Sequence, residues 1–300
     1  MHRRLLASIL LSSLSSLHAS ELETISVSQS GSALDSQPSA LSSQITAAEV
    51  ADINTADSED VIKYQPNLMV RKRFIGDRNG LLTFRDMHNF QTPRALVYSD
   101  GLLLSNFLGA NFGTAPRWDV VQPREIDRVE ILYGPYSARY SGNSLGGVTV
   151  FHTTMPSQPM AHLSAGTFLQ DFDDYGTDET YLGHRLNAVI GDRKGDWSVL
   201  LAASRLENEG HPQSFALTRG PGANPGTPVT GAYPYSQGGY LYNAASGSEV
   251  TEQNLKLKLG YDLTRDLQAR LTLAWLDRRD ETLKPQTYLR DTNGSLVYNG

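Results

Sequence analysis

The residue types that most often carry out catalysis form no catalytic pattern in this 300-residue chain. No cysteine is present, which excludes disulfides, thiolate metal sites and cysteine nucleophiles. The seven histidines are scattered, and none has the HExxH spacing of a zinc site. Asp171, Asp173 and Gly176 resemble the start of a calcium loop, but Leu182 occupies the position of the closing glutamate. We therefore expect no metal site, no cofactor and no enzymatic activity.

The remaining chemistry is recognition by backbone and aromatic groups. A short β-prone segment near the N-terminus suits pairing with a partner protein as an added strand. It consists of Glu23, Thr24, Ile25, Ser26, Val27 and Ser28. Four tyrosines among glycines, Tyr233, Tyr235, Tyr240 and Tyr242, offer large apolar faces with polar tips. The net charge of -6 gives no bulk basic character, so we expect no nucleic-acid partner.

The first 20 residues have the layout of a secretory signal peptide. Arg3 and Arg4 give a positive start, and residues 5–17 are an uncharged run rich in leucine and serine. This run is too short and too rich in serine to span a bilayer as a helix. Because Ala19 and Ser20 are small, we expect cleavage after one of them and export from the cytoplasm.

Helix and strand signals are mixed in the next part of the chain. Residues 28–45 are rich in Ser, Gln and Ala and predict a flexible linker. Thr46 and Glu49 fit a capping box, and a second short helix is expected over 57–64, before Pro66. Strands are expected over residues 68–74, 81–84, 95–98, 128–132 and 148–152. This mixture predicts a small α+β domain.

After Pro156 and Pro159 the chain changes to alternation of apolar and polar residues, which predicts antiparallel strands. Expected strands are 160–169, 186–190 with 197–203, and 255–261 with 267–275, where Lys256 and Lys258 alternate with leucines. Short connections (191–196 and 263–266) alternate with longer ones (171–181, about 206–250, and from about 278), as in outer-membrane barrels. A soluble sandwich also alternates. Aromatic residues at the expected strand ends, Trp197, Tyr261 and Trp275, favour the membrane.

Five ordered segments resemble the plug of TonB-dependent outer-membrane receptors. They are residues 60–70, 82–87, 97–101, 126–135 and 137–148. Asp86 stands where that family usually has glycine, and it could pair locally with Arg85. Residues 23–28 resemble the family's TonB box. The resemblance implies an α+β plug domain followed by antiparallel transmembrane β-barrel strands.

The implied organisation is a signal peptide (1–20), the TonB box and a flexible linker (21–45), the plug (46–156) and a partial barrel (160–300). Plugged barrels have about 22 strands, of which this chain supplies about five, so we expect an N-terminal fragment. Plug arginines of the family pair with glutamates of the barrel wall. We therefore expect buried, paired charges at Arg85, Arg128, Glu130 and Arg139, with pairing of Arg128 and Glu130 on one sheet face as the simpler alternative. Turn conformations are expected at the plug glycines Gly101, Gly134, Gly142, Gly146 and Gly147.

The implied function is active transport of a scarce nutrient complex, first of all a ferric siderophore, across the bacterial outer membrane. Expected partners of this monomer are TonB with its energising complex, the ligand and outer-membrane lipid, and the plug and box would reach the periplasm. The ligand would be held by His88, Asn89, Phe90, Gln91, Asn106, Phe107 and Phe112 of the plug and by the four tyrosines. Those tyrosines could instead form an aromatic girdle. Alternatives are a passive porin or adhesin barrel, or a receptor for cobalamin, haem or saccharide.

Overall fold

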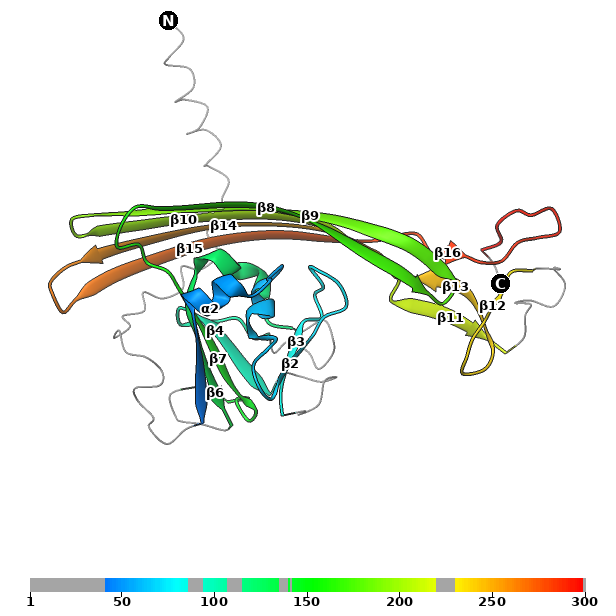
Figure 1. Ribbon diagram of the computed structural model, residues 1–300, viewed down its shortest axis with the longest axis horizontal. Coiled ribbons are helices and arrows are strands. Elements are labelled where there is room, and N and C mark those ends of the chain that lie inside the picture. Colours follow the sequence, from blue (N-terminus) through cyan, green and yellow to red (C-terminus); the bar gives the residue numbers. More distant parts are fainter. Residues whose placement is uncertain are drawn as a thin grey trace, which may run out of the picture.

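The computed structural model describes residues 41–85, 94–106, 115–134, 140, 142–219 and 230–298. Within these ranges, no helix is both long and apolar enough to cross a membrane. The described chain has two parts (Figure 1). The described residues between 42 and 153 form an α+β unit, called the plug below. The five long strands that follow form a curved sheet, called the wall, and the plug lies against one face of it.

Helical structure in the plug is short. α2 (Ala47–Asp52) begins at Thr46, whose hydroxyl accepts from the Glu49 N–H at 3.4 Å while Glu49 Oε2 accepts from the Thr46 N–H at 2.7 Å. This is the expected capping box. The second expected helix is only a 3-10 turn, η1 (Ser58–Ile62). Two further 3-10 turns, η3 (Trp118–Val120) and η4 (Pro123–Glu125), precede the longest strand of the plug.

The plug sheet has the strand order β1-β6-β7-β4-β5. Its members are β1 (Ser42–Thr46), β6 (Ile126–Tyr133), β7 (Gly147–Thr153), β4 (Ala95–Ser99) and β5 (Leu102–Leu103), of which only the β4–β7 pair is parallel. Because β1 pairs with β6 from Ser42 onwards, the sheet begins inside the segment expected to be linker. β2 (Leu68–Arg71) and β3 (Leu81–Phe84) form a separate hairpin. β2 ends earlier than expected because Asp77 binds both the backbone N–H and the guanidinium of Arg73, which turns the chain.

The plug core lies between the sheet and the helical turns. Trp118 meets Phe151 edge-on at 6.0 Å, and its Nε1 donates to the Gly80 carbonyl at 2.6 Å. Gly147 leaves no space for a side chain, since a Cβ there would lie 2.4 Å from the Leu132 carbonyl oxygen. Close packing of this kind fixes β7 against β6 and holds the end of β7 in one place.

The wall is antiparallel, in the order β15-β14-β10-β9-β8. Its strands are β8 (Met160–Asp174), β9 (Thr177–Lys194), β10 (Trp197–Gly210), β14 (Ser248–Asp262) and β15 (Gln268–Thr282). The strands are longer than expected, and the predicted loop over 171–181 is wrong. There, β8 and β9 are joined by Tyr175 and Gly176 alone, with φ of +54° and +78°. Two positive φ values fit a tight type I′ turn, so no longer loop is needed.

The connection between β10 and β14 carries a small sheet of its own. It contains β11 (Ser214–Thr218), β12 (Tyr233–Pro234) and β13 (Tyr240–Ala245), and β16 (Gln286–Thr287) joins β13 after β15. Figure 1 shows this small sheet and the β8–β9 turn at one end of the wall, whereas the β9–β10 and β14–β15 turns lie at the other end. The wall therefore has one end that carries the small sheet and one end with short turns.

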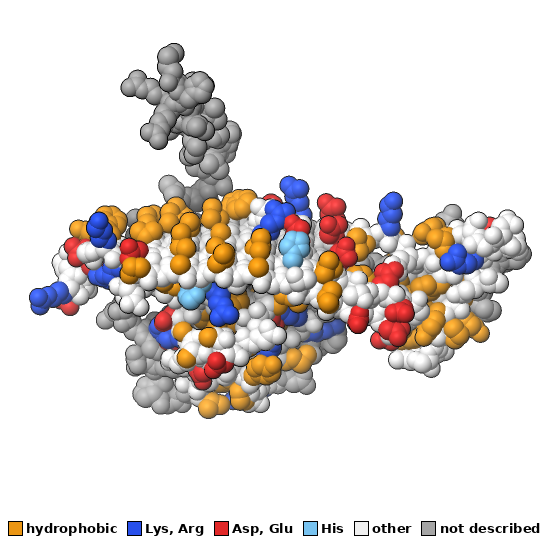
Figure 2. Space-filling view, turned by 45° about the horizontal axis from the view of Figure 1, so that its top comes forward, with side chains coloured by type: hydrophobic (Ala, Val, Ile, Leu, Met, Phe, Trp, Pro, Cys, Tyr) orange, Lys and Arg blue, Asp and Glu red, His pale blue; other side chains and the backbone are white. Residues whose placement is uncertain are grey.

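The two faces of the wall also differ. The face away from the plug carries exposed apolar side chains in rows across the strands (Figure 2). They include Leu163, Leu186, Ile190, Leu201, Leu255, Leu271 and Leu273. The ring centroids of Trp197 and Tyr261 lie 4.6 Å apart at strand ends, as expected. Trp275, in contrast, lies within β15 and not at its end. Apolar residues outside and polar residues inside are the pattern of a transmembrane barrel.

Candidate functional site

β14 carries the main line of contact between wall and plug. Its even-numbered residues from 250 to 260 face the plug because successive strand residues point to opposite faces. Asn254 Nδ2 donates to the Asp119 carbonyl of η3 at 2.6 Å. At Gly260 a Cβ would lie 2.5 Å from the terminal methyl carbon of Met155, in the segment that joins plug and wall. The strand thus contacts the plug over most of its length.

Lys256 and Lys258 reach from β14 into the plug as buried cations. The Lys256 side chain is 3% exposed, and its Nζ lies 2.5 Å from Oε1 of the fully buried Glu125. Lys258 Nζ lies 3.0 Å from Asp100 Oδ2, and it donates to the carbonyl and hydroxyl of Thr153 at 3.0 and 2.5 Å. Burying an ion costs several kcal/mol unless its partners compensate. Each lysine is therefore committed to groups of the plug.

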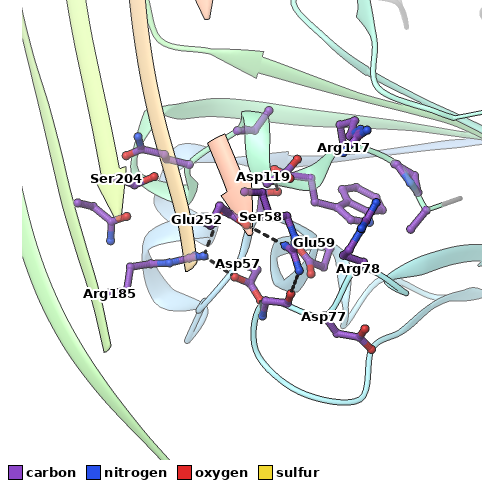
Figure 3. A pocket seen from close by; sticks show the side chains of 18 of the residues that line it. Asp57, Ser58, Glu59, Asp77, Arg78, Arg117, Asp119, Arg185, Ser204 and Glu252 are labelled. Carbon is purple, nitrogen blue, oxygen red and sulfur yellow. Dashed lines mark hydrogen bonds and ion pairs between the residues drawn. The ribbon is translucent and has the colours of Figure 1, made fainter. Parts of the chain in front are cut away.

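A second charged group surrounds Asp57, just before η1 (Figure 3). Arg185 of β9 contacts Asp57 at 2.7 Å and Glu252 of β14 at 3.8 Å. From the plug side, Lys72 contacts both Asp57 and Asp60 at 2.8 Å. This group joins two wall strands to the N-terminal half of the plug.

The charges in this group shift the pKa values of the plug carboxyls in opposite directions. Burial alone would raise the pKa of Asp57, but the Arg185 and Lys72 charges outweigh burial and hold that pKa well below its usual range. Burial, followed by the charge of Asp57, raises the pKa of Glu59 well above its usual range. One carboxylate thus holds the cations, while its neighbour favours the protonated form.

A polar cavity of about 50 Å³ lies beside the charged group, between plug and wall. Gln122, Asp119 and Asn187 are among its lining residues. Within the described chain, the side-chain amide of Gln122 and Oδ1 of Asp119 have no hydrogen-bond partner. Burial raises the pKa of Asp119 in spite of the nearby Arg278. A polar cavity of this size has room for a few water molecules, so this part of the contact can be hydrated.

The tyrosines predicted to bind the ligand lie at the end of the wall that carries the small sheet. The ring centroids of Tyr235 and of Tyr175 in the β8–β9 turn lie 5.9 Å apart. Tyr233 lies against Gly176, where a Cβ would be 2.9 Å from the tyrosine ring. Tyr240 and Tyr242 are half-buried members of β13. An aromatic row continues from Tyr175 through Phe215 and Phe172 to His211.

The predicted plug charges are placed differently from the expectation. Arg85 is exposed, with a φ of +49°. Arg128 Nε contacts Oε1 of the fully buried Glu130 at 3.1 Å, and His152 Nε2 lies 3.4 Å from the same oxygen. Both partners belong to the plug sheet, which matches the simpler alternative of a pair on one face. Asn106 lines the cavity. Residues 23–28, His88, Asn89, Phe90, Gln91, Phe107, Phe112 and Arg139 lie outside the described residues.

The plug glycines have different reasons to be glycine. Gly101 and Gly134 have φ of +89° and +106°, the left-handed region that glycine adopts easily. At Gly146 a Cβ would meet the Arg94 carbonyl oxygen at 3.0 Å, so space is the constraint, as it is at Gly147. Gly142 has neither a positive φ nor a close neighbour, so the expected turn requirement is not seen there.

Sequence reasoning missed the cations that the wall presents to the plug. Lys256 and Lys258 were visible as the polar members of an alternating strand, and Arg185 stands in an alternating run in the same way. A charge repeated on the inward face of a barrel strand was the available signal. The partner of Lys256 could not be predicted, because Glu125 is 131 positions away from it.

Known proteins match both parts of the chain. Residues 33–148 match the TonB-dependent Receptor Plug Domain. The vitamin B12 transporter BtuB of Vibrio vulnificus is 25% identical over 159 residues, which cover 51% of this chain and 24% of the transporter. The match thus spans about a quarter of that transporter.

Two solved receptors share the fold. A variant of the ferric enterobactin receptor PfeA from Pseudomonas aeruginosa, in complex with enterobactin, has a TM-score of 0.55 and 15% identity, covering 81% of this chain and 34% of that receptor. The siderophore receptor PirA from Acinetobacter baumannii has a TM-score of 0.58 and 17% identity, and the match covers 86% of this chain and 34% of that receptor. The chain spans about a third of each receptor. Residues 33–148 thus match the plug domain of TonB-dependent receptors, and most of the chain shares the fold of these two solved receptors.

Proposed function

We propose that this chain forms the gate and part of the barrel of an active importer in the bacterial outer membrane. The observation that carries the proposal is a plug bound to the polar face of a wall whose other face is apolar. Lys256, Lys258 and Arg185 of the wall bind plug carboxylates, and exposed leucines cover the opposite face. A passive porin or adhesin barrel does not need a plug held in this way.

Energy would come from TonB, acting through residues 23–28. A segment of this kind can pair with a partner as an added strand, because its backbone groups supply the hydrogen bonds. The segment precedes β1, which is an edge strand of the plug sheet. A pull on the segment would reach β1 first, and an edge strand can leave a sheet without breaking it in the middle.

The proposed substrate class is a ferric siderophore. Support comes from the row of aromatic rings at the end of the wall, since flat aromatic faces can pack on the aromatic or hydrophobic groups of a chelator. The proposed site combines these rings with Tyr233, Tyr235 and the plug residues 88–91. Vitamin B12 is the second candidate, because a vitamin B12 transporter, BtuB, matches part of the chain in sequence.

Growth and uptake in the full-length receptor test this function. Cells that depend on this receptor for iron should grow on at least one ferric siderophore, and only when TonB is present. Ile25→Pro and Val27→Pro remove N–H groups that strand pairing needs, so uptake should be lost while binding to whole cells remains. Ser36→Pro, in the expected linker, is the matched control and should transport normally.

Two results would change the proposal. Normal uptake by both proline variants would show that residues 23–28 are not the TonB box. Cobalamin uptake without growth on any ferric siderophore would replace the substrate class and leave the energy coupling in place.

A further inference from the structure

We propose that Lys256 and Lys258 form a wall-side latch, which fixes the plug to β14 and keeps the barrel closed until the plug is pulled. The inference rests on the proposed function only in taking the plug as the gate of the barrel. Its polarity is the reverse of the pairing implied by the family resemblance, in which plug arginines meet wall glutamates.

Two neighbouring inward positions of one wall strand hold three separate parts of the plug. Lys256 binds Glu125 of η4, directly before β6. Lys258 binds Asp100, between β4 and β5, and Thr153 at the end of β7. β4, β7 and β6 are consecutive in the plug sheet. The two lysines thus fix one end of each of its three central strands.

The latch contacts are internally braced. Glu125 Oε1, which receives Lys256, also accepts from the Gln122 N–H at 2.9 Å. Asp100 Oδ1 accepts from the Thr153 N–H at 2.9 Å, so the two groups bound by Lys258 also hold each other. Each cation therefore meets a preorganised acceptor. Removing a cation leaves its plug acceptor group without a cationic partner.

The latch is also shielded from water, unlike the charge pairs on the outward face of the wall. The Lys256 and Lys258 side chains are 3% and 5% exposed, whereas Arg205 of the outward pair with Glu207 is 50% exposed. Exposed pairs contribute little because water screens them. Breaking a buried pair from one side is costly because the remaining charge stays buried. Loss of the two lysines should therefore loosen the plug, whereas loss of an exposed wall cation should not.

The latch lies where the chain passes from plug to wall. Met155 packs against Gly260, and Pro156 fills the space beside Gly191, where a Cβ would lie 2.4 Å from Pro156 Cγ. These glycines admit the connecting segment close to the wall. The latch and the covalent connection thus hold the same end of β7, whereas the Asp57 group lies beside the polar cavity. A pull on the N-terminal side should leave the latched end in place longest.

Leakage through the full-length receptor tests the latch. The variant Lys256→Met/Lys258→Met would be produced in cells without TonB and challenged with a hydrophilic antibiotic too large for general porins. Loss of two buried partners should lower the inhibitory concentration about fourfold or more. Lys194→Met, at an exposed wall lysine outside the latch, is the matched control and should leave resistance unchanged. Heat-modifiable migration on gels would verify that each barrel is folded.

Charge exchange keeps the inference open to refutation if the double methionine variant does not fold. Lys256→Glu alone should leak, and Lys256→Glu/Glu125→Lys should restore resistance. A folded methionine variant with normal resistance would overturn the latch, and so would an exchanged pair that leaks as much as Lys256→Glu. Because neither TonB nor a siderophore takes part in this experiment, its failure is separate from failure of the proposed transport function.

Discussion

At the scale of single residues, burial decides which charges hold the plug. Asp57 keeps its carboxylate because Arg185 and Lys72 compensate for the loss of water. Glu59 is 3% exposed, and its distance to Lys72 Nζ is 3.7 Å, so its compensation is weaker. The contributions of Asp57 and Glu59 to stability therefore change with pH in opposite directions.

This difference predicts how stability changes with pH. The lowered pKa of Asp57 adds stability that is present above the unfolded-state pKa and is lost as the pH falls through the folded-state value. The raised pKa of Glu59 has the opposite sign: its contribution is full below the unfolded-state pKa, about 4.3, and is lost as the pH rises through the raised value. Glu59→Gln should therefore raise the melting temperature of the full-length receptor progressively more as the pH rises. An equal effect at acidic and alkaline pH would contradict this.

The sequence revealed the charged residues but not their partners. Alternation placed Lys256 and Lys258 on one face of a strand, and the spacing of Arg128 and Glu130 allowed their pairing within the plug sheet. Contacts such as Lys258 with Asp100 join positions 158 apart, and no local rule of spacing applies across that distance. The family resemblance suggested plug arginines paired with wall glutamates. Arg78 of the plug does meet a wall carboxylate, that of Asp280, at 3.3 Å. In the pairs with Asp57, Glu125 and Asp100 the cation belongs to the wall instead.

At the scale of elements, hairpin existence was predictable and strand length was not. The β14–β15 hairpin was visible because apolar residues alternate on both sides of a short turn. The ends of β8 and β9 could not be predicted, because Asp171, Asp173 and Asp178 give this stretch a loop-like composition. In the structure these residues continue the ladder, with Asp173 opposite Asp178. Ladder hydrogen bonds are made by the backbone, so polar side chains can extend a strand past its apolar part.

The ends of the wall predict a topology that can be measured. Ser236 lies beside the small sheet, and Asp192 lies near the β9–β10 turn at the other end. We expect Ser236→Cys to react with a membrane-impermeant thiol reagent on intact cells, and Asp192→Cys to react only after the outer membrane is opened. The sequence has no native cysteine that would interfere. The reverse labelling pattern would show that the wall has the opposite orientation in the membrane.

At the scale of the whole molecule, plug and wall stabilise each other through groups that neither could bury alone. Glu125 and Glu130 are both fully buried, but Glu130 finds Arg128 and His152 within the plug, whereas Glu125 depends on Lys256 of the wall. If the plug moves as proposed, its internal pair can stay intact, whereas its external pair must break. This division fits the proposed gate, which has to leave the wall without losing its own fold.

The open sheet leads to a prediction about residues 21–300 expressed alone. Among the described residues, β8 and β15 are the outer strands of the wall, and each pairs with one neighbour only within that sheet. Unpaired strand edges and an uncovered apolar face promote association between chains, and a membrane admits strands only as a closed barrel. The isolated chain should therefore aggregate without detergent and show no heat-modifiable migration on gels, whereas the full-length receptor should show it. A monomeric, protease-resistant and membrane-inserted form of residues 21–300 would contradict this, because it would mean that the five described wall strands close or shield their edges by themselves.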